Sequence, residues 1–300
     1  MKKRTIETKA SNTAGYTCFS RACATRENSE LLRGPDDMAE IFLPVFAKVL
    51  LNVPALRKFF MDKIAPSGIY EYVIARTKVL DASFVDALEQ GFQQIVLLGA
   101  GMDTRALRFA EQNRGTKIYE LDVSTTQQPK LAIFKRKHVT LPAELVFVPI
   151  DFNKESLADA LIRAGYREQQ KTLFLWEGVT MYLNADAVDR TLEFIRTSAL
   201  AGSLVVFDYI YASVLRRENT CYGEAEIFDR VSKAGEGWTF GIEAGEIESF
   251  LSARGFQITA HHTPSELELR YLTMEDGRLL ARINGTHCIV SAAVGQEGKG

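Results

Sequence analysis

Two glycines with one residue between them follow a run of apolar residues in the first half of the chain. Gly99 and Gly101 come directly after residues 94–98, whose leucine and β-branched side chains are typical of a buried strand. Glycine lets the backbone turn sharply and places no side chain over the turn. Residues 104–110 then have the composition of a helix. A strand, a glycine turn and a helix in this order predict a nucleotide-type pocket at the carboxyl end of the strand.

Carboxylates stand at the ends of the next three expected strands, at Asp122, Asp151 and Glu177. An acid that ends the second strand, roughly 20 residues beyond the glycine turn, is placed to accept hydrogen bonds from ribose hydroxyls. Glu120 points to the same side of that strand as Asp122, so alternation leaves both residues open. We predict Asp122, because it lies later in the strand and closer to the mouth of the pocket.

The third glycine of a dinucleotide fingerprint is replaced here by Thr104. This departure disfavours a nicotinamide or flavin pocket. An NAD(P)-dependent oxidoreductase is still the alternative enzyme class, because it would share the sheet and the glycine turn. A binding protein that keeps the pocket without the chemistry is a second alternative.

From residue 93 onwards, short apolar segments alternate with helical ones. The expected strands are 94–98, 117–121, 145–150, 172–176, 204–209, 256–261 and 287–293. The expected helices are 104–113, 125–137, 154–165, 185–199 and 243–254. Repeated strand–helix–strand units predict an α/β fold with a mostly parallel sheet, wrapped on both faces by right-handed crossovers. A mixed stretch precedes the last strand, which favours an antiparallel pairing at the end of the sheet.

Residues 1–90 show helical periodicity and no strand pattern. The segments 39–51 and 69–80 each predict an amphipathic helix, and 81–91 predicts a further short helix that ends at Gly91. The apolar face of the first of these helices comprises Phe42, Val45, Phe46, Val49 and Leu50. We expect this part of the chain to pack on, or over, the sheet.

Residues 211–242 interrupt the alternation of strands and helices with charges, glycines and the aromatic residues Trp238 and Phe240. An insertion after the fifth strand lies at the carboxyl edge of the sheet, where ligands bind, so we expect a lid that faces the substrate. The whole chain is then a single catalytic domain. It comprises a helical cap (1–90), a core (91–210 and 243–294) and a lid insertion (211–242).

The composition is that of an ordinary soluble globular protein, with 46% hydrophobic and 25% charged residues. A net charge of −2 gives no electrostatic case for nucleic acid or for an anionic membrane. The most apolar region, residues 41–60, is interrupted by prolines and polar side chains and cannot span a bilayer. The amino terminus is too polar for a signal peptide. The four scattered cysteines (Cys18, Cys23, Cys221 and Cys288) predict no metal site and suit a reducing cytoplasm.

Several segments together resemble one family, the S-adenosyl-L-methionine-dependent methyltransferases of the leucine carboxyl methyltransferase group. The resemblance runs from about Thr13 to Val294. The segments that carry it are 98–104, 119–122, 75–78 with Asp81, 148–151, 176–183, 238–241 and 251–256. The chain is most similar to the bacterial branch, whose members are mostly O-methyltransferases known from sequence, some of them linked to polyketide-type metabolism.

This resemblance implies a class I methyltransferase fold, Rossmann-like, with a seven-stranded and mostly parallel sheet. It also implies S-adenosyl-L-methionine as the cofactor, with each role carried over to a matching position of this chain. Gly99 and Gly101 would pass under the methionine portion, and Asp122 would hold the ribose diol. The remaining implied roles are the adenine frame at Asp151 and Phe152, the amino group at Glu177 and the cofactor carboxylate at Arg76. Arg21 matches the family's early basic position less closely and is left out.

The reaction that the resemblance implies is O-methylation of a small molecule, at a carboxylate or a hydroxyl. A carboxylate is already ionised at neutral pH and needs no base, whereas a phenol or an alcohol needs one. Candidate bases near the expected mouth are Tyr182, Asp208, Tyr209, His261 and His262. Each of them also has an ordinary structural explanation, so we assign no catalytic residue from sequence.

Overall fold

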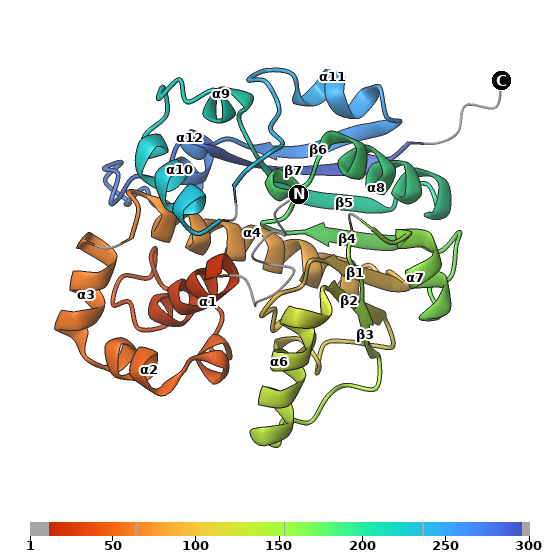
Figure 1. Cartoon of the computed structure of the whole chain (residues 1–300), viewed down its shortest axis with the longest axis horizontal. Coiled ribbons are helices and arrows are strands. Elements are labelled where there is room, and N and C mark those ends of the chain that lie inside the picture. Colours follow the sequence, from red (N-terminus) through yellow and green to blue (C-terminus); the bar gives the residue numbers. More distant parts are fainter. Residues whose placement is uncertain (1–11, 64, 153, 236, 296–300) are drawn as a thin grey trace.

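The computed structural model describes residues 12–63, 65–152, 154–235 and 237–295. A seven-stranded sheet runs through the middle of the molecule (Figure 1) in the order β3-β2-β1-β4-β5-β7-β6. Its strands are β1 (Gln94–Leu98), β2 (Lys117–Asp122), β3 (Leu145–Pro149), β4 (Thr172–Trp176), β5 (Leu204–Ile210), β6 (Phe256–His262) and β7 (His287–Val294). All seven predicted strands are present, with ends that differ by one residue at most.

The first five strands pair in parallel, whereas β7 lies antiparallel between β5 and β6. This arrangement confirms the predicted mostly parallel sheet with an antiparallel last strand. The strand order reverses at β1, which has β2 on one side and β4 on the other. Ligands of open α/β sheets bind at such a reversal, beyond the carboxyl ends of the strands.

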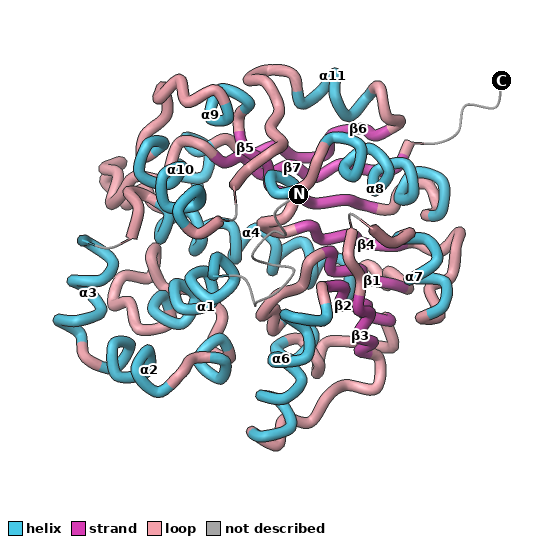
Figure 2. Tube along the Cα trace, in the orientation of Figure 1, coloured by secondary structure: helices cyan, strands magenta, loops and turns pink. Residues whose placement is uncertain are grey.

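Helices cover both faces of the sheet, which is why its central strands are continuous apolar runs. On one face, Val96 and Leu98 pack with α7 (Leu157–Arg163), α8 (Ala185–Ser198) and α11 (Ile247–Ser252). On the other face, Ile95 and Leu97 pack with α4 (Ile69–Glu89), α5 (Arg105–Arg108) and α12 (Pro264–Tyr271). Figure 2 shows these layers, together with α6 (Ser124–Arg136), which follows β2.

The amino-terminal helices α1 (Asn12–Ala24), α2 (Val45–Asn52) and α3 (Pro54–Lys63) gather beside the sheet (Figure 1). The prediction of one helix over 39–51 is wrong. A 3-10 turn, η2 (Ala39–Phe42), is followed by Leu43, whose ψ of 135° is extended, and α2 begins only after Pro44. Proline has no N–H to donate and disfavours helical geometry in the residue before it.

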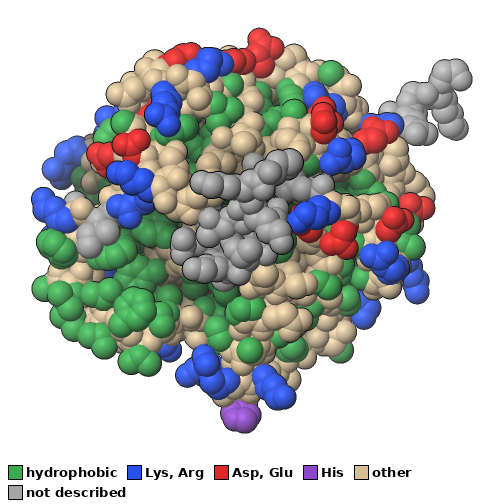
Figure 3. Space-filling model, viewed as in Figure 1, with side chains coloured by type: hydrophobic (Ala, Val, Ile, Leu, Met, Phe, Trp, Pro, Cys, Tyr) green, Lys and Arg blue, Asp and Glu red, His purple; other side chains and the backbone are tan. Residues whose placement is uncertain are grey.

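The break at Pro44 also overturns the predicted apolar face of this segment. Val45, Phe46 and Val49 are 81%, 70% and 54% exposed, while Ala47 and Leu51 are the buried residues of α2. Figure 3 shows hydrophobic side chains gathered over α2 and α3 on the surface of the molecule. The prediction assumed one continuous helix through Pro44. Because the helix begins anew after the proline, the other side of α2 faces the interior.

The expected boundary at Asp81 is also wrong, because α4 is one continuous helix of 21 residues. Asp81 does not begin a helix; its carboxylate binds Arg105 and Arg108 from within α4. The helix ends at Glu89, and Gly91 follows with a φ of 68°. The predicted stop at this glycine is therefore confirmed.

The insertion after β5 contains two helices, α9 (Ala212–Leu215) and α10 (Glu224–Lys233). Helix α12, which the sequence-based prediction missed, begins with a capping box: Thr263 and Glu266 cap each other's backbone N–H groups, and Pro264 occupies the first turn. This arrangement is a readable helix-start signal. Among the described helices, none is long and apolar enough to cross a membrane.

Candidate active site

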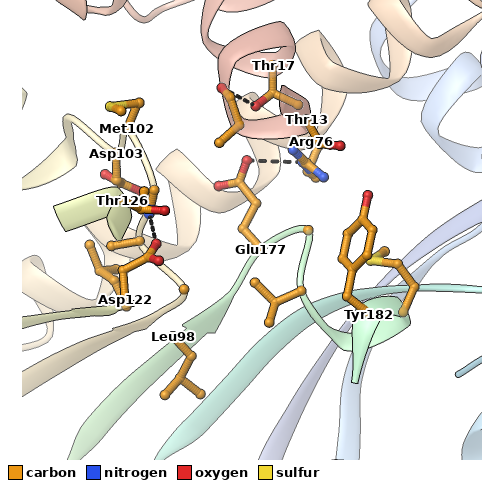
Figure 4. Close-up of a pocket in the computed structure, with 18 of the residues that line it drawn as sticks. Thr13, Thr17, Arg76, Leu98, Met102, Asp103, Asp122, Thr126, Glu177 and Tyr182 are labelled. Carbon is orange, nitrogen blue, oxygen red and sulfur yellow. Dashed lines mark hydrogen bonds and ion pairs between the residues drawn. The ribbon is translucent and has the colours of Figure 1, made fainter. Parts of the chain in front are cut away.

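A cavity of about 230 Å³ lies at the carboxyl ends of β1, β2 and β4. Its walls come from the sheet edge, from α1 and α4 of the cap, and from η3 (Thr180–Tyr182) and α10. The cavity is lined by all seven predicted site residues: Arg76, Gly99, Gly101, Asp122, Asp151, Phe152 and Glu177. In Figure 4, Asp122 and Tyr182 stand on opposite sides of the cavity, with Glu177 between them.

The glycine turn forms part of the lining of this cavity and has no room for a side chain at Gly99. The N–H groups of Gly99 and Ala100 both donate to the carbonyl of Leu121, each at 2.8 Å, which fixes the turn against β2. Gly99 has a φ of 75°, and a Cβ there would lie 2.4 Å from Cγ2 of Val179. Both the left-handed conformation and the close approach therefore require glycine.

Asp122 is tied directly to this turn. Its Oδ2 accepts the N–H of Gly101 at 2.6 Å, and its Oδ1 accepts the N–H of Val123 at 2.7 Å. Burial raises the pKa of the Asp122 carboxyl, while these two backbone N–H groups act in the opposite direction. The hydroxyl of Thr126 donates to the same carboxylate, which has about four acceptor sites and so can still accept from a hydroxyl in the cavity.

Glu120, the alternative to Asp122, does not line the cavity. Its carboxylate binds the ammonium of Lys130 at 2.6 Å, and both side chains are buried. Burial raises the pKa of Glu120 to about 7. The two acids lie on the same side of β2, as alternation predicts. Glu120, however, is bound to Lys130 of α6 below the cavity.

Glu177 lies between two guanidinium groups. Its Oε1 is 3.0 Å from Nε of Arg76 and its Oε2 is 2.8 Å from Nη1 of Arg105. Burial raises the pKa of this carboxyl, but Arg105 and Arg76 outweigh burial and hold it at about 2. Glu177 is therefore ionised throughout the neutral range, and Figure 4 shows its ion pair with Arg76.

Arg76 also binds a second carboxylate beneath the cavity. Its Nη1 lies 2.7 Å from Oδ2 of Asp208, which accepts the hydroxyl of Tyr72 at 2.9 Å as well. The other oxygen of Asp208 accepts the N–H of Gly178 at 2.6 Å. Arg76 reaches the cavity from the cap helix α4, so its position depends on how that helix packs on the sheet.

Three further arginines complete the charged end of the cavity. Arg21 of α1 donates to the carbonyl of Met102 at 2.7 Å and lies 3.2 Å from Asp36. The whole cluster comprises four guanidiniums (Arg21, Arg76, Arg105 and Arg108) and five carboxylates (Asp36, Asp81, Asp103, Glu177 and Asp208). The excess of one negative charge suits a cationic ligand.

The opposite end of the cavity is apolar. It is lined by Ile69, Val73, Met181, Ile227, Val231 and Trp238, with the aromatic rings of Tyr72, Tyr182 and His287 beside them. The apolar side chains come from the cap, from η3 and from the insertion, and they form one buried cluster. The two parts of the chain expected to cover the sheet edge thus meet at this end.

Only one of the candidate bases named from sequence lines the cavity, and it is Tyr182. Asp208 is buried beneath it. Tyr209 is hydrogen-bonded to Nε2 of His261 at 2.9 Å, away from the cavity, and His262 also lies outside its lining. Sequence reasoning missed His287, because a histidine that begins a buried strand has no local signal of function.

Asp151 and Phe152 lie at the rim of the cavity, just beyond the end of β3. The carboxylate of Asp151 forms a partly exposed ion pair with Lys154 at 2.5 Å, and Phe152 packs against the core on the α7 and α8 face of the sheet. A flat apolar ring beside an acceptor oxygen is a suitable frame for a purine.

No group of three or more His, Cys, Asp and Glu side chains in the described ranges could hold a metal ion.

The strand order and the glycine turn with its facing carboxylate together define the class I methyltransferase fold. The family model described as leucine carboxyl methyltransferase matches residues 14–196. The chain belongs to this family, and S-adenosyl-L-methionine is its cofactor. Membership of this family excludes the alternative interpretation of the glycine turn as a site for a nicotinamide cofactor.

Relatives with provisional names place the chain in the same class. The Bacillus subtilis (strain 168) protein YktD, provisionally named an S-adenosyl-L-methionine-dependent methyltransferase, is 27% identical over 86% of this chain and 90% of its own length. A Mycolicibacterium smegmatis protein with the same kind of name is 34% identical over 65% of this chain and 62% of its own length. A Frankia alni relative is 37% identical, but the alignment spans only 45% of that protein.

Solved structures are less similar. A Bacillus halodurans C-125 protein, provisionally titled a methyltransferase, aligns with 71% of this chain and 100% of its own, at 12% identity and a TM-score of 0.46. A likeness of this degree supports no argument about function.

Proposed function

We propose that this protein transfers the methyl group of S-adenosyl-L-methionine to an oxygen, carboxylate or hydroxyl, of a small molecule. The observation that carries the proposal is a single cavity with two unlike ends. One end is built of carboxylates and arginines around a glycine turn, and the other end is apolar and aromatic. A charged cofactor and an apolar acceptor can meet within it.

The side chains of the charged end fit the cofactor by their chemistry. S-adenosyl-L-methionine offers two ribose hydroxyls, an ammonium and a sulfonium, which call for acceptors and negative charge, and one carboxylate, which calls for a cation. Asp122 would accept the ribose hydroxyls, and Glu177 would face the ammonium. Arg76 would bind the carboxylate together with Arg21, since a guanidinium fork suits that bidentate contact.

The remaining cofactor residues follow from the shape of the sheet edge. Gly99 and Gly101 would lie under the methionine portion, because the turn that they form lines the cavity without a side chain. Asp151 and Phe152 would frame the adenine at the rim.

The bound cofactor supplies an electrophilic methyl group on a positively charged sulfur. The protein then has to hold the acceptor oxygen in line with that methyl group and to exclude water. We propose that the cap (1–90) and the insertion (211–242) do so as a lid on a single catalytic domain. Ile69 and Val73 of α4 belong to the same buried apolar cluster as Ile227 and Trp238 of the insertion, and this shared cluster supports the role. A polyketide-type acceptor suits such a wall and is part of the proposal.

Ligand binding and methyl transfer test the proposal separately. Calorimetry should show binding of S-adenosyl-L-methionine and S-adenosylhomocysteine, but not of NAD. Either sulfur ligand, at about a hundred times its Kd, should add about 2.7 kcal/mol of stability. A labelled methyl group should then appear in ethers or esters when small aromatic acids and phenols are supplied. Tight binding of NAD with no response to either sulfur ligand would overturn the proposal.

A further inference from the structure

His287 stands at the apolar end of the cavity, among aromatic rings. It begins β7, is 5% exposed and lines the cavity. Its ring centroid lies 4.6 Å from that of Tyr72 and 5.4 Å from that of Trp238, the second in an edge-to-face arrangement. A ligand that enters this end of the cavity would therefore meet the imidazole.

The hydrogen bonds behind His287 determine which of its nitrogens carries the proton. Nδ1 lies 2.7 Å from Oγ1 of Thr286, which in turn lies 2.6 Å from Oδ1 of Asn284. The amide of Asn284 is oriented by its own NH₂ group, which donates to the carbonyl of Ser67 at 2.9 Å. Oδ1 of Asn284 is therefore an acceptor, and the single hydroxyl proton of Thr286 goes to it. Thr286 must then accept from Nδ1–H of His287.

With the proton on Nδ1, Nε2 of His287 carries a lone pair. No hydrogen bond of Nε2 is found in the described part of the chain, and this nitrogen is not among the fully buried unpaired atoms of that part. Burial and the nearby Arg76 lower the pKa of His287 to about 3, so the imidazole is neutral at physiological pH. The ionisable neighbours on this side are Tyr72 and Arg76 of α4 and Asp208 of β5, which are bound to one another. Nε2 is thus an acceptor in the wall of the cavity.

The cations of the cavity argue against a carboxylate acceptor at this end. Among the described residues that line it, the cationic ones are Arg21, Arg76 and Arg105, and each is already paired with at least one carboxylate. An anionic acceptor at the apolar end would have only the sulfonium of the cofactor as a countercharge, because these arginines stand at the other end of the cavity, and burying a charge is costly. A neutral acceptor avoids this cost.

We propose that His287 is the catalytic base, and that the acceptor is a neutral aromatic hydroxyl compound whose O–H donates to Nε2. This inference rests on the proposed function and narrows its acceptor from carboxylate or hydroxyl to hydroxyl. The flat body of a phenol would lie among Tyr72, Trp238 and the aliphatic side chains of α4 and α10.

The step is balanced by the groups already named. The acceptor oxygen forms a bond to the methyl carbon, and the bond between that carbon and sulfur breaks with its electron pair passing to sulfur. The hydroxyl proton passes to Nε2 and is released to solvent with the products. A protonated ether is a far stronger acid than the imidazolium, even with the lowered pKa, so the proton transfer becomes favourable as the new bond forms.

The contacts of the site link this base to the cofactor end. Glu177, Arg76, Asp208 and Tyr72 form a continuous chain of ion pairs and hydrogen bonds, and the Tyr72 ring lies tilted against the ring of His287. Thr286 is a positioning residue, because it acts on the acceptor only through the orientation of His287.

The activity test compares His287→Asn with His138→Asn, a change at an exposed histidine. The probes are phenol, 4-nitrophenol and benzoate, with labelled S-adenosyl-L-methionine. H287N should lower turnover of phenol by about 10²- to 10⁴-fold, leave the cofactor Kd within about twofold, and lose much less with 4-nitrophenol at a pH where that phenol is ionised. H138N should change none of these. Methylation of benzoate in preference to the phenols, or equal losses with both phenols, would overturn the inference.

A second test observes His287 directly in the cofactor-bound protein. Nitrogen-15 NMR, with the signals assigned by single histidine variants, should show a neutral ring protonated at Nδ1 at pH 7. Adding 4-nitrophenol below its pKa should shift Nε2, and Thr286→Val should mix the two tautomers. A ring protonated at Nε2, or a cationic ring at pH 7, would overturn the inference while the cofactor still binds. A failure of the cofactor to bind would overturn the proposed function itself.

Discussion

The guanidinium of Arg76 lies 2.7 Å from the carboxylate of Asp208, and the two residues come from different parts of the fold. Asp208 is fully buried in the sheet strand β5, while Arg76 belongs to the cap helix α4. Breaking a buried ion pair by removing one partner costs about 3–5 kcal/mol. The cap therefore cannot move far from the sheet at this point without leaving a buried charge unpaired. The part of the proposed lid that can open is accordingly the insertion, not α4.

Replacing Asp122 with alanine should weaken cofactor binding by at least tenfold without unfolding the protein. Hydrogen bonds to a charged group are worth about 1.5–3 kcal/mol each, and Asp122 would accept two from the ribose. The N–H of Gly101 would also lose its acceptor, which loosens the turn under the ligand. Calorimetry with S-adenosylhomocysteine measures the effect.

Glu120→Gln is the matched control for this prediction, because Glu120 lies on the same strand but outside the cavity. It should reduce stability by about 1–3 kcal/mol by leaving the buried ammonium of Lys130 poorly paired. The Kd for the cofactor should stay within about twofold. The reverse pattern, with a strong effect on binding at Glu120 only, would contradict the assignment.

Gly99→Ala should destabilise the protein by about 2–5 kcal/mol. The left-handed φ costs an alanine roughly 1–2 kcal/mol, and the new Cβ would overlap Cγ2 of Val179, which adds the cost of overpacking, about 1–3 kcal/mol. Urea unfolding measures the total. Adding Val179→Ala should recover the part due to the overlap.

Gly165→Ala separates these two causes. Gly165 has a φ of 93°, but nothing lies within 4 Å of the position of its Cβ. Its substitution should cost only the conformational part, about 1–2 kcal/mol. Equal losses at both glycines would show that the contact with Val179 is unimportant.

The sheet, the glycine turn and the carboxylates at the strand ends were predictable because their signals are local. The turn at Gly99 and the acid at Asp122 are both dictated by the strand that precedes them, and alternation fixed which side of β2 the acid faces. Strand ends meet at one edge of a parallel sheet, so residues more than 50 apart in sequence could be placed together without knowing any contact.

The rest depends on contacts that no local pattern reveals. Whether Val45 points inward is decided by the break at Pro44 and by what α1 covers, not by helical periodicity. Arg21 becomes a site residue only because α1 packs over the glycine turn. The state of His287 depends on Thr286 and Asn284, and the amide of Asn284 is fixed by Ser67, more than 200 residues earlier in the chain.

Glu226→Ala should loosen the insertion and leave the rest of the protein intact. The carboxylate of Glu226 in α10 accepts both the N–H and the hydroxyl of Ser67, each at 2.9 Å, and so ties α10 to the start of α4. These bonds are exposed, so their loss should cost only about 0.5–1 kcal/mol. Amide exchange in α10 should nevertheless quicken, and turnover should fall more than stability.

The wild-type protein provides the reference for this prediction. Exchange in α10 should slow when the cofactor is added and slow further when an acceptor follows, because Ile227 and Val231 line the cavity. Exchange in α8, which lies in the core on the far side of β4 and β5 from α4, should not respond. Exchange in α10 that is indifferent to both ligands would contradict a lid.

Glu177→Gln should remove part of the pH dependence of the free energy of unfolding in the acid range. The pKa of Glu177 is about 2 in the folded protein, against 4.5 for a free side chain. A lowered pKa means that this carboxylate stabilises the fold fully above pH 4.5 and that the contribution is lost as the pH falls towards 2. The difference corresponds to about 3 kcal/mol. Urea unfolding of the wild type and E177Q should therefore differ most at pH 6–7, and the two curves should converge towards pH 2–3.

Glu193→Gln is the control for the acid dependence, because Glu193 also pairs with an arginine, Arg196, but on the surface. Solvent screening makes such a pair worth about 1 kcal/mol or less, so E193Q should follow the wild type across the whole pH range.

Cofactor affinity gives the second readout. E177Q should bind S-adenosylhomocysteine more weakly at neutral pH, because an amide would face its ammonium where a carboxylate stood, whereas E193Q should bind it normally. A constant gap between E177Q and the wild type down to pH 2 would show that Glu177 contributes through packing and not through its charge.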